Sequence, residues 1–209
     1  MLSDQSYTTW RDQGIKMDNN IQIGQFNLAI KPLQIHSSYV VFSSIMNMFF
    51  YFYLFPKLKK HGYNPNSLFK MALGVLLSSI SFMMYIIVEI YLNKGIITSI
   101  FWQLPQFFFM ATGEVLLGVN GIEFVYSESH AEVKCIVYSG WIITIAIGNF
   151  LVAIFSMIKI GTYIGNVINY HNAEIIDGII YILFGIIGFC FFYWFSRIYK
   201  FKNQNFYSK

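Results

Sequence analysis

Long apolar runs alternate with short polar segments along most of the chain. Each run holds about 20 mostly apolar residues, the length at which an α-helix crosses the hydrocarbon core of a bilayer. The strands of an outer-membrane barrel would instead alternate apolar and polar positions over about ten residues. The pattern therefore predicts five membrane-spanning helices, at Leu33–Phe55, Met71–Leu92, Ile96–Tyr126, Cys135–Ile158 and Gly178–Ser196.

The composition supports a membrane protein. Of the 209 residues, 56% are hydrophobic and only 11% are charged, whereas soluble domains carry about 25% charged residues. The fold class predicted is an all-α, polytopic membrane helix bundle in contact with lipid. The net charge of +4 is a topology signal in such a chain, and no nucleic-acid partner is expected.

The positions of lysine and arginine predict the orientation of the bundle. Segment 56–70 holds four lysines, and the tail after the last run holds one arginine and three lysines, whereas the loops at 93–95 and 159–177 hold one lysine each. Cytoplasmic segments are enriched in these residues. The N-terminus is therefore expected outside and the C-terminus in the cytoplasm, with the plasma membrane as the expected location.

Two glutamates, Glu114 and Glu123, interrupt the third apolar run. A charged side chain is costly inside a membrane, so each glutamate is expected to have a function or a partner. Nine residues on a helix amount to 900°, which places the two on opposite faces and about 13 Å apart along the axis. Glu123 needs a cationic partner, for which Lys134 and a residue of another helix bundle are the candidates.

The surroundings of Glu114 favour binding over catalysis. Ala111, Gly118 and Gly121 share its face at helical spacing and let a helix or ligand approach the backbone closely. A buried carboxylate of this kind suits a proton relay or the recognition of an ammonium group. The sequence shows neither a Ser/His/Asp or Cys/His arrangement nor a phosphate loop, so the protein is not expected to be an enzyme, and no metal site is expected.

A series of motifs resembles the proton-coupled oligopeptide transporter family of the major facilitator superfamily. Within residues 102–154 these are WQLPQ, TGEV, GIEFVYSESH and GWIITIAIGN; DQSYTTW at 4–10 and KPLQ at 31–34 extend the similarity outward. The resemblance implies the C-terminal half of that fold. Residues 1–31 would form the end of helix 7 and an extracellular segment, and residues 32–209 a bundle of helices 8–12 with a cytoplasmic tail.

The resemblance also implies roles for individual residues. Glu114 would bind the amino group of a peptide in a central cavity that Trp141 and Tyr39 help to line. Glu123 would belong to the cytoplasmic gate, and Asp4 would act in gating or proton coupling. The chain departs from the family pattern where Tyr39 replaces an asparagine, Gly118 replaces a serine and SESH replaces SQAP.

The function expected from these residues is that of the C-terminal half of a proton-coupled di/tripeptide symporter. Protons would be the coupling ion, no other cofactor is expected, and the half would be inactive without an N-terminal helix bundle. Two alternatives remain: a family member that moves another substrate, such as histidine or nitrate, or a non-transporting truncated paralogue or incomplete gene product.

Overall fold

The computed structural model describes residues 8–23, 26–63, 65–158, 160–168 and 172–199. Within these residues, five helices are long and apolar enough to cross a membrane: Pro32–Lys60, Ser67–Asn93, Ile100–Glu128, Lys134–Leu151 and Ala173–Ile198. They coincide with the five predicted apolar runs. Burying the polar backbone in lipid requires continuous helices, and the prediction of an all-α membrane bundle is confirmed.

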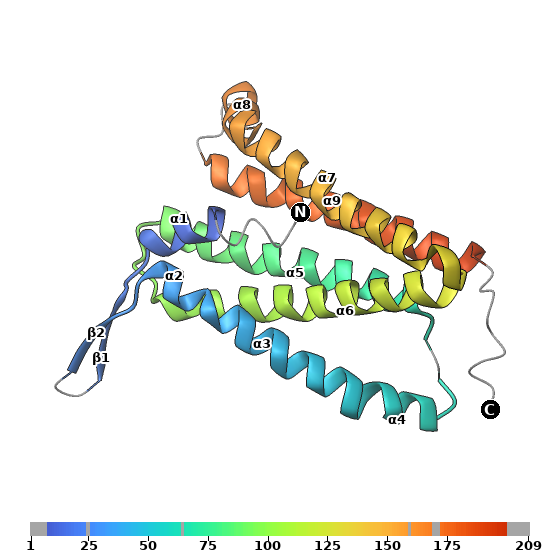
Figure 1. The fold of residues 1–209 in the computed structure, drawn as a ribbon. Coiled ribbons are helices and arrows are strands. Elements are labelled where there is room, and N and C mark those ends of the chain that lie inside the picture. Colours follow the sequence, from blue (N-terminus) through green and yellow to red (C-terminus); the bar gives the residue numbers. More distant parts are fainter. Residues whose placement is uncertain (1–7, 24–25, 64, 159, 169–171, 200–209) are drawn as a thin grey trace.

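Helix α5 (Ser67–Asn93) is the centre of the bundle and packs along both α6 (Leu104–Glu128) and α9 (Ala173–Ile198). The hydroxyl of Tyr199, just after α9, donates to Glu128 at the end of α6 (3.1 Å). The C-terminal ends of α6 and α9 therefore meet. The lysine-rich segment that precedes α5 lies at this same end of the bundle (Figure 1).

The first span changes its helical type along its length. It consists of α2 (Pro32–Ile35), α3 (Ser37–Met48), a π-helical stretch η2 (Phe49–Leu54) and α4 (Phe55–Lys60). Pro56 cannot donate a hydrogen bond, and its ring would clash with the carbonyl of Phe52 in a regular α-helix. The wider π turns immediately before Pro56 accommodate this conflict.

The segment predicted to be a loop at 159–177 is largely helical. A short 3-10 turn η4 (Ala131–Val133) leads into α7 (Lys134–Ile158), which is followed by α8 (Ile160–Ile168), and α9 begins at Ala173. The prediction of a loop was wrong. The segment is too short and too polar to show the pattern of a membrane-spanning helix, so its helical structure was not recognised from the sequence. Gly161 lets α8 pack closely against the start of α9, because a Cβ there would meet the Ala173 carbonyl oxygen at 2.6 Å.

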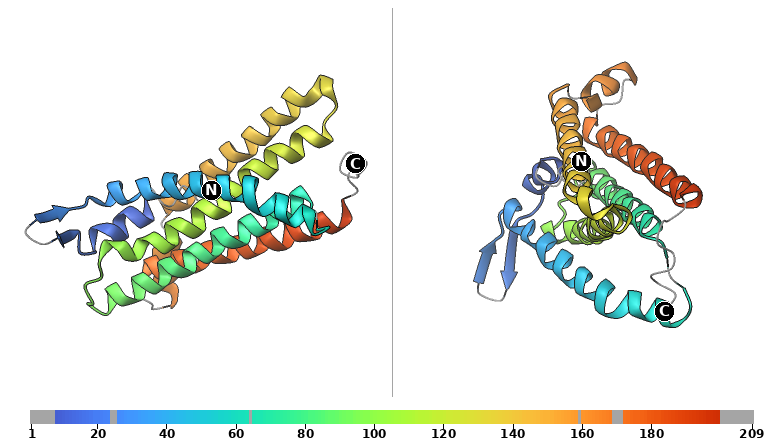
Figure 2. Two further views of the ribbon diagram at one scale, coloured as in Figure 1. Left: turned by 90° about the horizontal axis from the view of Figure 1, so that it is seen from below. Right: turned by 45° about the vertical axis from the view of Figure 1, so that its right-hand side comes forward.

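The polar N-terminal segment docks on one end of the bundle. It forms α1 (Thr9–Ile15) and an antiparallel hairpin of β1 (Asn20–Ile23) and β2 (Phe26–Ala29), which projects beyond the helices (Figure 2). The hairpin is a small addition to the all-α architecture that the apolar pattern did not predict. A bridge from Asp18 to Ser99 ties the segment to the turn η3 (Ile100–Gln103) before α6.

The main core lies at this same end. Trp10 of α1 is completely buried and makes edge-to-face contacts with Phe82 of α5 (5.7 Å between ring centroids) and Phe107 of α6 (5.1 Å). The cluster also includes Ile35, Tyr85, Ile100, Met110 and Tyr181. One tryptophan thus anchors α1 on both α5 and α6.

Candidate functional site

Glu114 lies half-buried on α6 and has a buried carboxylate oxygen. Gly118, one turn further along the same face, borders open space: a Cβ added there would meet no atom within 4 Å. Of the small residues predicted to share this face, Gly118 is the open one, whereas Ala111 and Gly121 are buried. An opening next to a partly desolvated carboxylate can accept a cationic group of a ligand.

Trp141 reaches the same face of α6 from the neighbouring helix α7. A Cβ on Gly121 would lie 2.5 Å from Cη2 of Trp141, so the indole occupies the space that a larger residue would fill. Gly121 follows Glu114 by seven residues, which is two helical turns on one face. The structure therefore places Trp141 and Glu114 on one face of α6, with the open position at Gly118 between them.

Tyr39 comes from α3 and lies half-buried against the core cluster that contains Phe107 and Met110. Phe107 and Met110 precede Glu114 by seven and four residues and share its face. The ring of Tyr39 lies 5.5 Å from that of His36, between ring centroids. Glu114, the open position at Gly118 and Trp141 lie along one face of α6 and form the candidate site, whereas the place of Tyr39 in that site stays a prediction.

Glu123 has a different partner from those expected. Its carboxylate lies 3.9 Å from Nζ of Lys70, in the first turn of α5, while Lys134 lies over the ring of Tyr126, 5.9 Å from its centroid. Lys70 also lies 4.3 Å from the centroid of Phe55. The pair depends on α5 and α6 running antiparallel side by side, which the spacing within α6 alone does not reveal.

The fifth predicted site residue, Asp4, lies outside the described residues. Its role in gating or proton coupling stays a prediction. Among the described residues, the histidine, cysteine, aspartate and glutamate side chains form no group of three or more that could hold a metal ion.

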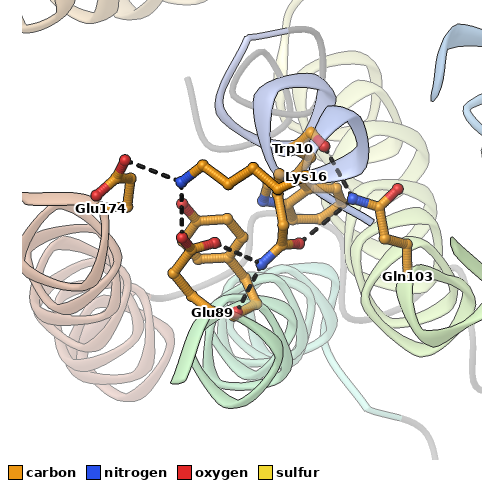
Figure 3. Close-up of polar contacts among 7 residues, drawn as sticks. Trp10, Lys16, Glu89, Gln103 and Glu174 are labelled. Carbon is orange, nitrogen blue, oxygen red and sulfur yellow. Dashed lines mark hydrogen bonds and ion pairs between the residues drawn. The ribbon is translucent and has the colours of Figure 1, made fainter. Parts of the chain in front are cut away.

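A buried polar cluster that sequence reasoning missed lies beside Trp10 (Figure 3). Its centre is Glu89, the lone charge in its apolar run, which is completely buried. One carboxylate oxygen accepts from Lys16 Nζ at 2.9 Å and the other from Gln13 Nε2 at 3.1 Å. Lys16 also bonds Glu174 of α9 at 3.0 Å. The cluster therefore ties α1 to both α5 and α9.

Two glutamines of the WQLPQ motif extend the polar cluster to α6. Gln103 Nε2 donates to the carbonyl oxygen of Trp10 at 2.8 Å, and Gln106 Nε2 donates to Oε1 of Gln13 at 3.2 Å. Burial would lower the pKa of Lys16, but the hydrogen bonds to Glu89 and Glu174 raise it above its ordinary value. The signals in the sequence were the isolated Glu89 and the paired glutamines, whose partners lie more than 70 residues away.

Comparison with known proteins gives consistent matches. A family model described as "POT family" matches residues 1–168. "Solute carrier family 15 member 1" of Oryctolagus cuniculus is 42% identical over 53 residues, which are 25% of this chain and 8% of that protein. "Peptide transporter family 1" of Drosophila melanogaster is 32% identical over 107 residues, 51% of this chain and 13% of that protein.

Solved structures match the fold. An "auto inhibited POT family peptide transporter" superimposes with a TM-score of 0.84 at 24% identity, over 98% of this chain and 39% of that one. A "POT family transporter in complex with thioalcohol conjugated peptide" gives a TM-score of 0.67 at 16% identity, over 94% and 38%. The chain thus spans about two fifths of the length of these solved transporters.

Proposed function

Since this chain belongs to the POT family, we propose that it forms the C-terminal half of a proton-coupled symporter that imports di- and tripeptides across a membrane. The observation that carries this proposal is the candidate site: Glu114, the open position at Gly118 and Trp141 on one face of α6. The family membership and the named peptide transporters among the relatives support the same substrate class. Protons are the proposed coupling ion.

The proposed chemistry assigns one part of the peptide to each side chain. The Glu114 carboxylate binds the peptide's amino group, since a charged hydrogen bond in a partly desolvated site is stronger than one in water. The indole of Trp141 offers its face to the same cation, and the Tyr39 hydroxyl extends the polar lining. Glu123, paired with Lys70, and Asp4 are proposed for gating or proton coupling.

The exposed faces of two helices support a missing partner bundle. In the Pro32–Lys60 span only 6% of an apolar stretch of 18 residues is buried within the protein, and in the Lys134–Leu151 span none of this stretch is buried. Apolar faces of this extent require lipid or further helices against them. Because alternating access needs one bundle rocking against another around the site, we propose that this half does not transport alone.

The arrangement of the basic residues supports the proposed orientation. Lys57, Lys59 and Lys60 end α4, and Arg197 lies in the last turn of α9. Both helix ends lie at one end of the bundle (Figure 1), as the positive-inside rule requires of a cytoplasmic side. We therefore propose an outside N-terminus and a cytoplasmic C-terminus, in the plasma membrane.

Uptake measurements test the role of Glu114. Cells expressing this chain together with the N-terminal half of a related POT transporter are expected to take up dipeptide at an acidic external pH, and cells with either half alone are not. The Glu114→Gln variant should lower uptake by about 10- to 100-fold, the effect of losing a charged hydrogen bond. Glu132→Gln, on an exposed carboxylate of η4, is the matched control and should stay within about twofold of the parent.

An N-acetylated dipeptide makes this test specific to the amine. If Glu114 binds the charged amino group, the acetylated peptide competes poorly for dipeptide uptake by the parent protein. The Glu114→Gln substitution should then cause no further loss of competition by the acetylated peptide. Unchanged dipeptide uptake in Glu114→Gln would refute the amine-binding role. A parent that transports histidine or nitrate and no dipeptide would refute the proposed substrate class.

A further inference from the structure

An apolar cavity of about 280 Å³ lies at the lysine-rich end of the bundle, away from the candidate site. It is lined by residues of η2, α4 and α5, together with Leu116 of α6 and Tyr63 of the connection between α4 and α5. The π-helical widening before Pro56 supplies part of the cavity wall. Its lining includes Phe50, Leu54, Phe55 and Leu77.

The chemistry of the lining selects a hydrocarbon. Lys70 is the single charged residue among the lining residues that the structure describes, and its charge is directed to Glu123 and to the Phe55 ring. Apart from the exposed Tyr63, the other lining residues are apolar, so the cavity offers little to a peptide or an ion and favours an apolar ligand. A flexible hydrocarbon chain fits both the volume and the lining.

The cavity opens to the outside of the bundle. Tyr63 and Leu73 both line it, and they are 55% and 36% exposed. Leu73 lies on α5, a membrane-spanning helix, so its exposed side faces the surroundings of the bundle. A lipid acyl chain in the membrane can therefore enter the cavity from the side without crossing the protein.

Exposed cations flank the cavity. Lys57, Lys59 and Lys60 lie in the last turn of α4 and are exposed, and Leu58, in the middle of them, lines the cavity. Lys57 is held by a hydrogen bond from Nζ to the Tyr53 hydroxyl (3.3 Å). Clusters of lysines at the end of a membrane-spanning helix attract anionic lipid headgroups.

We propose that this cavity holds one acyl chain of an anionic phospholipid whose headgroup binds the three lysines of α4. The apolar lining fixes the chain, the lysines select the headgroup, and the lateral opening gives lipid direct access. This site is separate from the α6 face that contains Glu114, and the proposal does not depend on the transported substrate.

Lipid titration by native mass spectrometry of the full chain in detergent tests the headgroup. Phosphatidylserine is expected to bind at least about tenfold more tightly than phosphatidylcholine with identical palmitoyl and oleoyl chains, since each lysine near a membrane surface contributes about a fivefold factor. Replacing the three lysines together (Lys57→Gln, Lys59→Gln, Lys60→Gln) should abolish the preference. Lys94→Gln, an exposed lysine at the far end of α5, is the matched control and should preserve it.

The chain-binding half of the proposal is tested separately. The Leu73→Trp substitution narrows the cavity from its exposed wall. It should weaken the binding of both lipids about tenfold without changing the headgroup preference. A phosphatidylserine with a diazirine on its acyl chain should label residues 50–77 of the unmodified protein, a result that needs no variant to fold. Equal binding of the two headgroups, or labelling spread evenly over all lipid-facing helices, would overturn the proposal.

Discussion

The Gly113→Val variant is expected to prevent α5 and α6 from packing and to abolish folding of the bundle. A Cβ on Gly113 would lie 2.5 Å from the carbonyl oxygen of Gly74 and 2.8 Å from the backbone nitrogen of Ser78. Both atoms belong to the backbone of the opposite helix, so no side-chain rotation relieves the clash. A Cβ on Gly74 would meet the carbonyl oxygen of Gly113 at 2.6 Å, so the contact is tight from both sides.

The loss should exceed that of ordinary overpacking, which costs about 1–3 kcal/mol, because the whole α5–α6 interface would have to separate. Small residues permit such close approach of membrane helices. Size-exclusion profiles and thermal unfolding in detergent measure the effect, and Gly113→Val should give no monodisperse species. Gly118→Val, on the same helix with open space at its Cβ, should elute and melt like the parent. A Gly113→Val protein that matches the parent would show that the helices do not pack this closely.

The position of Gly113 shows what helical spacing can predict. Its place beside Glu114 in the TGEV motif was visible, but the spacing argument drew attention only to the small residues on the face of Glu114. Gly113 points about 100° away from that face, toward α5. Which face of a helix meets which neighbour is a tertiary property, so the sequence showed the presence of glycines without showing which one forms the contact.

The five spans could be predicted from the sequence because one physical constraint dominates them. Lipid offers no hydrogen bonds, so an apolar run of sufficient length must be helical. That constraint is weaker outside the spans. The α8 helix and the β1–β2 hairpin lie in segments of mixed polarity, where several local structures have similar free energies, and neither was predicted.

Charged pairs were the least predictable part of the site. The half-turn between Glu114 and Glu123 follows from α6 alone, but the partner of Glu123 is Lys70, 53 positions earlier in the chain. Glu89 likewise meets Lys16 across 73 residues. The roles of Trp141 and Tyr39 came from the resemblance, and the structure adds that Trp141 lies along the α6 face of Glu114.

The Lys16→Met variant is expected to destabilise the end of the bundle that contains Trp10. It would leave the Glu89 carboxylate completely buried with Gln13 as its remaining donor in the polar cluster. Removing one partner of a fully buried ion pair costs about 3–5 kcal/mol. Because the Lys16 side chain is 42% exposed, solvent screening reduces the expected loss to about 2–3 kcal/mol, or about 4–12 °C in Tm.

A double variant separates the charge from the packing. Adding Glu89→Gln to Lys16→Met removes the uncompensated charge and keeps an oxygen that can accept from Gln13. Most of the lost stability should therefore return, whereas two independent substitutions would add their losses. Lys94→Met, at an exposed position beyond α5, is the control and should change Tm little. A double variant less stable than Lys16→Met alone would refute a buried charge pair at Glu89.

The pH dependence of this effect has a definite sign. Hydrogen bonds to Glu89 and Glu174 raise the pKa of Lys16 above the ordinary value of 10.5. A group whose pKa is raised in the folded state contributes its full stability below its unfolded pKa and loses it as pH rises through the folded value. The difference in Tm between the parent and Lys16→Met should therefore be constant from about pH 7 to 9.5 and shrink above 10.5. A difference that already disappears between pH 7 and 9 would mean that Lys16 is not held protonated by the buried carboxylate, and that packing of its aliphatic stem is what anchors α1.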